Sequence, residues 1–145
     1  MIRECDMTSL SLTHLRYRPS WDVLLGTFRK GTITVAGDAM HVMGPFLGQG
    51  GSAALEDAVV LARCLAYQNI NDHKRLELKK IEEAMDLYVK ERRMRLVRLS
   101  AQTYLTGLLL SSSDWSLLKK ILLVGTMAVI FHDPLSHTLY DCGSL

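Results

Sequence analysis

The sequence predicts an α/β fold in which short strands near the N-terminal end are followed by mostly α-helix. Residues 10–17 alternate in polarity and residues 32–37 are rich in β-branched side chains, and both features favour strands. From residue 50 onward, apolar residues recur at helical spacing. The chain has 145 residues, of which 48% are hydrophobic and 22% charged, which is enough for one domain with a sizeable core.

Two strands are expected before residue 40. The alternation from Leu10 to Tyr17 is imperfect and stops at Pro19, where a strand would end. Further on, the chain should turn at Lys30 and Gly31 into the stretch "TITVAG", a short buried strand that ends at Gly37.

Three helices are expected after residue 49. The first runs from Gly50 to about Tyr67, with small and apolar residues on one face: Ala54, Ala58, Leu61, Ala62 and Leu65. The second starts at Arg75 and places Leu78, Ile81, Met85, Tyr88, Leu96 and Leu99 on one face. Its charged residues predict i,i+4 pairs: Asp86 with Lys90 and Glu91 with Arg95. Ser113 or Asp114 would cap the third.

Charge and composition exclude several classes of partner. The net charge is only +2, and Glu91 interrupts the basic run "KERRMRLVR", so this run is interpreted as a solvated helix face and no nucleic acid is expected. The three cysteines are widely spaced, which favours neither a disulfide framework nor a zinc site. No metal is expected.

The apolar stretch from Ile121 to Phe131 is too short to cross a bilayer, which takes roughly 20 residues. We interpret it as a buried or interface helix, and the alternative is peripheral contact with a membrane surface. The N-terminus lacks a secretory signal pattern, so an intracellular protein, of the cytoplasm or chloroplast, is expected.

The segment between the second strand and the first long helix carries the candidate site. Asp38 follows the strand directly, and Gly48, Gly50 and Gly51 surround Gln49 just before the helix. A carboxylate at a strand end, a glycine loop and an open helix N-terminus suit an anionic or dinucleotide ligand. The glycines alone would favour a turn that merely lets the helix pack tightly on the strand.

The combined pattern is more specific. The stretch "GDAMHVMGPFLGQGG" from Gly37, followed by "EDAVVLARCLA" from Glu56, resembles the second flavin-binding motif of class A FAD-dependent monooxygenases of the aromatic-hydroxylase type. The flanking "LRYRPSWDVLLG" and "YDCGSL" are similar to the plant monooxygenases related to zeaxanthin epoxidase.

The resemblance implies a fold and a division of the chain. The fold would be the C-terminal fragment of an FAD/NAD(P)-binding fold, glutathione-reductase-like and of the para-hydroxybenzoate-hydroxylase type. Residues 1–67 would hold the end of the substrate sheet with the last strand, flavin loop and helix of the FAD-binding domain. Residues 68–145 would form a C-terminal helical region.

The resemblance also implies roles in binding FAD. Asp38 would accept a hydrogen bond from a hydroxyl of the ribityl or ribose region, and Pro45 would lie beside the isoalloxazine ring. Gly48, Gln49, Gly50 and Gly51 would offer backbone N–H groups to the N1 and C2 carbonyl side of the flavin. No catalytic residue is assigned to this chain.

Other conspicuous residues are given structural interpretations. His41 is assigned to the loop scaffold. Glu56 and Asp57 are adjacent on a helix and point about 100° apart, which favours capping, a salt bridge to the strand layer or solvent exposure over a paired-carboxylate site. Cys64 is expected to be a small buried hydrophobe. Gly107 is expected on a helix remote from the cofactor.

The chain also departs from the family pattern. Val42 stands where many relatives have proline, and Gly44 where a hydroxyl residue is common, which together loosen the loop. No G-x-G-x-x-G with a following acidic residue is present, so the AMP half of FAD has no site here. The chain is therefore expected to be the C-terminal part of a larger enzyme, with the missing N-terminal half as its partner.

Two classes of function follow. In the first, the completed enzyme takes hydride from NAD(P)H and lets dioxygen form a flavin C4a-hydroperoxide, which oxygenates a small organic substrate. In the second, the truncated chain is catalytically inactive and serves as an interaction or regulatory module through its helices.

Overall fold

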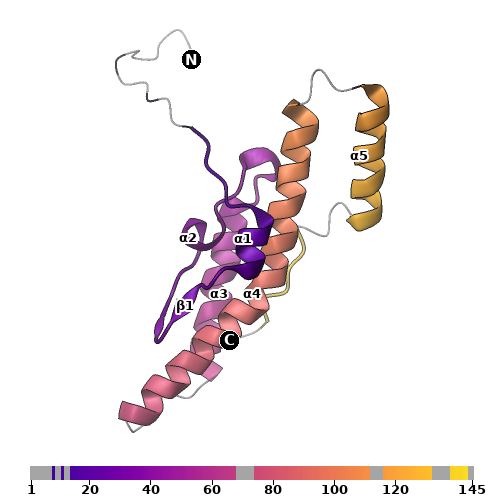
Figure 1. Cartoon of the computed structure of the whole chain (residues 1–145). Helices are drawn as coiled ribbons and strands as arrows, with labels where there is room; N and C mark the ends of the chain where they lie inside the picture. Colours follow the sequence, from indigo (N-terminus) through magenta and orange to yellow (C-terminus); the bar gives the residue numbers. More distant parts are fainter. Residues whose placement is uncertain are drawn as a thin grey trace.

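A computed structural model describes residues 8, 11, 14–67, 74–111, 116–131 and 138–143, with only the backbone for 74–77 (Figure 1). It is mostly helical, with two very short antiparallel strands. Its elements are α1 (Ser20–Leu25), β1 (Arg29–Lys30), β2 (Ile33–Thr34), α2 (Asp38–His41), the 3₁₀-helix η3 (Pro45–Leu47), α3 (Gly50–Tyr67), α4 (Lys74–Ser111) and α5 (Leu117–Ile130).

The strands are shorter than the sequence predicts. The turn at Lys30 and Gly31 is confirmed, but the hairpin pairs only Lys30 with Ile33 and Arg29 with Thr34. The strand expected over 10–17 is wrong for the part that the structure describes, since residues 14–19 have no regular structure. There, Arg18 N–H donates to the carbonyl of Val42 at 2.7 Å, so this backbone contacts a loop and not another strand.

Helix α3 has the predicted bounds, but its buried face is different. The residues that it buries are Ala53, Asp57, Val60 and Cys64, whereas the predicted face included Ala58 and Ala62, which are exposed. The prediction followed apolar periodicity, which cannot register a carboxylate buried on the packed face. Cys64 is a buried hydrophobe, as predicted.

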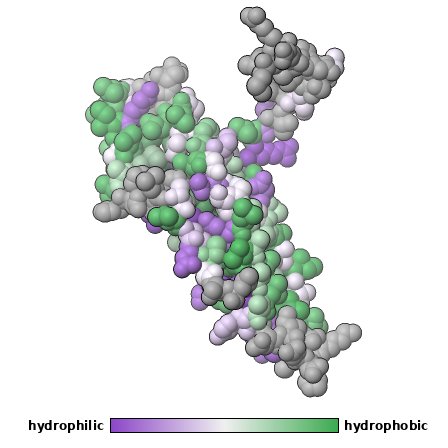
Figure 2. All heavy atoms as spheres, turned by 180° about the vertical axis from the view of Figure 1, so that it is seen from behind, coloured by the Kyte–Doolittle hydropathy of each residue, from purple (hydrophilic) through white to green (hydrophobic). Residues whose placement is uncertain are grey.

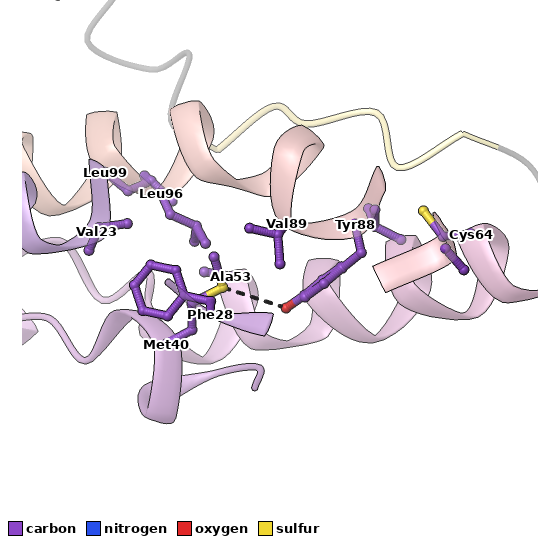
Figure 3. Packing of buried hydrophobic residues seen from close by; sticks show 11 residues of the cluster. Val23, Phe28, Met40, Ala53, Cys64, Tyr88, Val89, Leu96 and Leu99 are labelled. Atoms are coloured by element: carbon purple, nitrogen blue, oxygen red, sulfur yellow. Dashed lines mark hydrogen bonds between the residues drawn. The ribbon is translucent and has the colours of Figure 1, made fainter. Parts of the chain in front are cut away.

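Helix α4 is the long element against which α1, η3 and α3 pack (Figure 1). Tyr88, Leu96 and Leu99 on its predicted apolar face are buried, whereas Leu78 is exposed. Figure 3 shows the core that these helices enclose, with the Tyr88 hydroxyl directed at Met40 Sδ, 3.9 Å away. The full cluster is Val23, Phe28, Met40, Ala53, Val60, Cys64, Ala84, Tyr88, Val89, Leu96 and Leu99.

The acidic residues of α4 have partners on other elements. Arg29 of β1 binds both carboxylate oxygens of Asp86, at 2.5 and 2.7 Å, where the sequence predicted Lys90. Glu91 is bound by Arg63 of α3. These ion pairs therefore tie β1 and α3 to α4.

The residue at the N-cap of helix α5 is Ser116. The predicted caps, Ser113 and Asp114, lie outside the described residues. None of its residues is buried, which contradicts the buried interpretation. Figure 2 shows the hydrophobic atoms that gather over this helix at the upper left. In the part of the chain that the structure describes, no helix combines the length and the apolar character needed to cross a membrane.

Candidate functional site

The candidate site begins at the short helix α2, whose first residue is the exposed Asp38. The preceding Gly37 has φ 58° and ψ −142°, a conformation that residues with a β-carbon rarely adopt. Its carbonyl accepts hydrogen bonds from the N–H groups of Met40 and His41, both at 2.9 Å. Gly37 therefore fixes where the chain turns into α2, and with it the position of Asp38.

The loop from Gly44 to Gln49 continues the site. Pro45 is exposed and opens η3, where its fixed φ suits the first helical position. Gly48 ends η3 in the left-handed conformation, at φ 64°. Its N–H donates to the carbonyl of Pro45 at 3.0 Å, which closes the turn. The loop is therefore a defined turn with Pro45 and Gly48 on its surface.

Helix α3 begins where this loop ends. Ala53 N–H donates to the Gln49 carbonyl at 2.9 Å, so the N–H groups of Gly50 and Gly51 precede the first such helical bond. A β-carbon at Gly48 or Gly51 would meet nothing within 4 Å, and at Gly50 only Met43 Cγ, at 4.0 Å. The surrounding chain thus leaves open space here, so tight packing within the described residues does not explain Gly50 and Gly51.

The structure brings the two halves of the candidate site to one end of α3. A β-carbon on Gly37 would lie 3.5 Å from that of Ala54, in the first turns of α3. Asp38, next to Gly37, therefore lies near the first turns of α3, and the loop that carries Pro45, Gly48 and Gln49 leads into the start of the same helix. Together these residues form the candidate surface.

Gly107 is not remote from this surface, which corrects the expectation for it. A β-carbon at Gly107 of α4 would lie 2.3 Å from Phe46 Cε2, inside contact distance, and Phe46 belongs to η3. Helix η3 therefore rests on α4 through Phe46, and a side chain at 107 would push against the loop.

Beneath the surface lies a carboxylate whose burial the sequence did not predict. Asp57 of α3 is fully buried. Its Oδ2 accepts hydrogen bonds from Gly37 N–H at 2.8 Å and from His41 Nε2 at 2.6 Å, and its Oδ1 accepts one from Arg92 Nε at 2.7 Å. His41, also fully buried, thus belongs to the scaffold as predicted.

Arg92 corrects the interpretation of the basic run as a solvated face. Its side chain is fully buried, and besides Asp57 it binds Glu56 Oε2 at 2.7 Å and the carbonyl of Ala53 at 3.2 Å. Arg95 binds the other oxygen of Glu56 at 3.0 Å. Glu56 and Asp57 are therefore both ion-paired, but to α4 and not to the strand layer that the sequence analysis expected.

The C-terminal segment covers these cations. The ring of Tyr140 lies 4.8 Å from the guanidinium carbon of Arg92 and 5.1 Å from that of Arg95. Its hydroxyl donates to Glu91 Oε1 at 3.3 Å. Arg92 Nη1 has no hydrogen-bond partner among the described residues, so the aromatic ring provides a favourable contact for that cation.

The surroundings of Asp57 keep it ionised. Burial acts to raise its pKa, but hydrogen bonds from His41, the Gly37 amide and Arg92 outweigh burial and hold the pKa below its ordinary value of 3.8. Burial acts to lower the pKa of Arg92, but its hydrogen bonds with Asp57 and Glu56 outweigh burial and raise that pKa. Asp57 and Arg92 therefore both stay charged near neutral pH.

We expect these charges to make the fold sensitive to acid. Because the pKa of Asp57 is lower in the folded than in the unfolded chain, its contribution to stability is present above 3.8 and is lost as the pH falls through the folded value. Urea unfolding at about pH 6 and about pH 3 should show this loss, and Asp57→Asn should make the decline shallower. An unchanged decline in the variant would contradict the assignment.

The site therefore combines the Asp38 carboxylate, backbone N–H groups at the start of α3 and open space in front of them. The buried ion pair of Asp57 and Arg92 supports α2, which carries Asp38. The chain belongs to the family of FAD-binding domains, whose model matches residues 4–103. The resemblance to FAD-dependent monooxygenases is thereby confirmed, and the second flavin motif lies within the matched segment.

Similar proteins named as monooxygenases support the same class. Monooxygenase 1 of Arabidopsis thaliana is 57% identical over 150 residues, covering 100% of this chain and 37% of that protein. Monooxygenase 2 of the same plant is 32% identical with the same coverage. The chloroplastic zeaxanthin epoxidase of an Oncidium hybrid cultivar is 34% identical over 59% of this chain and 13% of that protein. No solved structure gives a significant match.

The chain thus spans little more than a third of the length of the first two relatives. The sequence pattern alone identified the family. It did not predict the burial of Asp57 or its pairing with Arg92, for which the available signal was an acidic pair on α3 opposite a basic run on α4.

Proposed function

We propose that this chain supplies the flavin- and ribityl-binding loop of an FAD-dependent monooxygenase that oxygenates a small organic substrate with dioxygen and NAD(P)H. The observation that carries the proposal is the open space in front of Gly48, Gly50 and Gly51 within the segment matched by the FAD-binding family. A ligand that approaches the backbone closely requires such space.

The residues present fit an FAD molecule. Asp38 is exposed and ionisable, and would accept a hydrogen bond from a ribityl or ribose hydroxyl. The N–H groups of Gly50 and Gly51, with the positive end of α3, would face the N1 and C2 carbonyl side of the ring. Pro45 would shape the edge of the ring site through its fixed φ. When bound, FAD would supply hydride acceptance and activation of dioxygen.

The finer fold assignment is part of the same proposal. The para-hydroxybenzoate-hydroxylase type would place residues 1–67 in the FAD-binding domain and its substrate sheet, and 68–145 in a helical region. The exposed apolar side chains Trp21 and Leu25 of α1, 62% and 78% exposed, would then be covered by the rest of the polypeptide.

A second function remains a candidate because the chain matches only 37% of the length of Monooxygenase 1. It would be a catalytically inactive chain that acts as an interaction or regulatory module. The exposed apolar residues of α5, including Leu117, Leu118 and Val129, favour it, since such surfaces commonly contact another protein.

The isolated chain should bind no FAD through purification. It would hold only the flavin and ribityl side of the cofactor, and losing the pyrophosphate and adenosine contacts removes most of the binding free energy. The purified 145-residue chain should therefore be colourless, and its visible spectrum should show no flavin absorption bands. Stoichiometric flavin in that spectrum would show that the site is complete without other segments.

Asp38→Ala should weaken FAD binding. The variant is best made in a hybrid in which this chain replaces the matching segment of Monooxygenase 1. Loss of one hydrogen bond to a charged group should cost about 1.5 to 3 kcal/mol in FAD affinity, measured by titrating the apoprotein. Asp22→Ala, which removes an exposed carboxylate from α1, is the control and should leave affinity unchanged. Equal affinities for both variants would remove Asp38 from the site.

A further inference from the structure

One carboxylate oxygen holds both ends of α2. Oδ2 of Asp57 accepts hydrogen bonds from the N–H of Gly37, which precedes the helix, and from the ring of His41, its last residue. Between these two points lies the four-residue helix that begins with Asp38. A helix this short has little stability of its own, so external contacts must hold it.

The other carboxylate oxygen of Asp57 binds α4, so that one side chain links α2 to α4. Oδ1 binds Arg92 Nε at 2.7 Å, and the same guanidinium reaches Glu56 and the Ala53 carbonyl on α3. Arg92 has a fully buried side chain, so water does not compete for these bonds. The position of Asp57 is therefore fixed by α4 as well as by its own helix.

The C-terminal segment completes the arrangement. The ring of Tyr140 lies over Arg92, and its hydroxyl donates to Glu91, which also binds Arg63 of α3. The aromatic ring covers the guanidinium and limits its access to water. Removal of the ring would admit water to the cation and weaken its bond to Asp57.

We propose that Asp57 is a positioning residue for the FAD-contacting residue Asp38, and that Arg92 and Tyr140 act on Asp38 through it. The proposal rests on the proposed function only for the ligand that Asp38 meets. The series of contacts that links these residues is present in the protein without cofactor. It runs from Tyr140 through Arg92 and Asp57 to Gly37 and His41.

The first test measures amide hydrogen exchange in the 145-residue chain, so it needs no cofactor. Tyr140→Ala and Asp57→Asn should speed exchange of the Gly37 and His41 amides by roughly tenfold, more than for amides in the middle of α4. Tyr140→Phe retains the ring and should stay close to the parent at these two amides. Leu96→Ala, a buried-core variant, should speed exchange throughout and give no excess at α2.

The second test measures FAD affinity of the same variants in the Monooxygenase 1 hybrid. Tyr140→Ala should weaken FAD affinity more than Leu96→Ala does. Tyr140→Phe, which keeps the aromatic ring, should bind FAD about as tightly as the parent hybrid. If the parent hybrid bound no FAD, the proposed function would be wrong while the exchange data still decided the positioning role. Exchange at Gly37 and His41 that rises no more than in α4 for both Tyr140→Ala and Asp57→Asn would overturn the inference. If Asp57→Asn does not fold, Tyr140→Ala and Tyr140→Phe decide it alone.

Discussion

Arg92→Met should lower the free energy of unfolding by about 3 to 5 kcal/mol, the cost of leaving a buried charge without its partner. Methionine fills much of the same volume, so the loss comes from the buried carboxylate of Asp57 and not from a cavity. Without the guanidinium, Asp57 loses its cationic partner Arg92 and keeps the bonds from the Gly37 amide and His41. Urea unfolding near neutral pH measures the difference.

Arg29→Met is the matched control for that variant. Arg29 binds both oxygens of Asp86, but the side chain of Asp86 is 60% exposed, so water replaces the lost partner. Such pairs contribute about 0 to 1 kcal/mol. Equal destabilisation by the two variants would show that the buried pair of Arg92 and Asp57 contributes no more to stability than the exposed pair of Arg29 and Asp86.

Gly50→Val should reduce FAD affinity much more than it reduces fold stability. Within the chain, the new β-carbon would approach only Met43 Cγ, at 4.0 Å, so the fold accommodates it. The added methyl groups would instead occupy the space assigned to the flavin. Overpacking of this kind costs about 1 to 3 kcal/mol, or roughly fivefold to 150-fold in affinity. FAD titration of the hybrid, with urea unfolding in parallel, separates the two effects.

Gly125→Val serves as the control for Gly50→Val. Gly125 lies on α5, and a β-carbon there would also meet nothing within 4 Å. Gly107→Val is unsuitable, because the added side chain would displace Phe46 of the loop. If Gly50→Val bound FAD as tightly as Gly125→Val, the glycines at the start of α3 would be no more than a turn.

Local sequence signals predicted the three long helices but not the short helices α1 and α2, and they predicted the strands poorly. Helix α3 was predicted from Gly50 to Tyr67 because glycines precede a long apolar repeat. The alternation before Pro19 failed because a strand needs a partner, and Arg18 bonds instead to the Val42 carbonyl. Strand pairing depends on residues distant in sequence, which alternation does not specify.

The candidate surface could be predicted because its residues lie within one short segment. From Asp38 to Gly51 the chain contains the carboxylate, the proline and the glycines in order. The buried support could not be predicted in the same way. Arg92 lies 35 residues after Asp57, and its burial depends on how α3 and α4 pack. A basic residue in a polar run is indistinguishable by sequence from its solvated neighbours.

The contact between Gly107 and Phe46 has an evolutionary consequence. The two positions share one volume, because any β-carbon at 107 would overlap the ring of Phe46. Residues 46 and 107 should therefore covary: a lineage that gains a side chain at 107 should carry a small residue at 46. Where the aromatic ring is retained, purifying selection should keep glycine at the α4 position, although this glycine is 61 residues away in sequence.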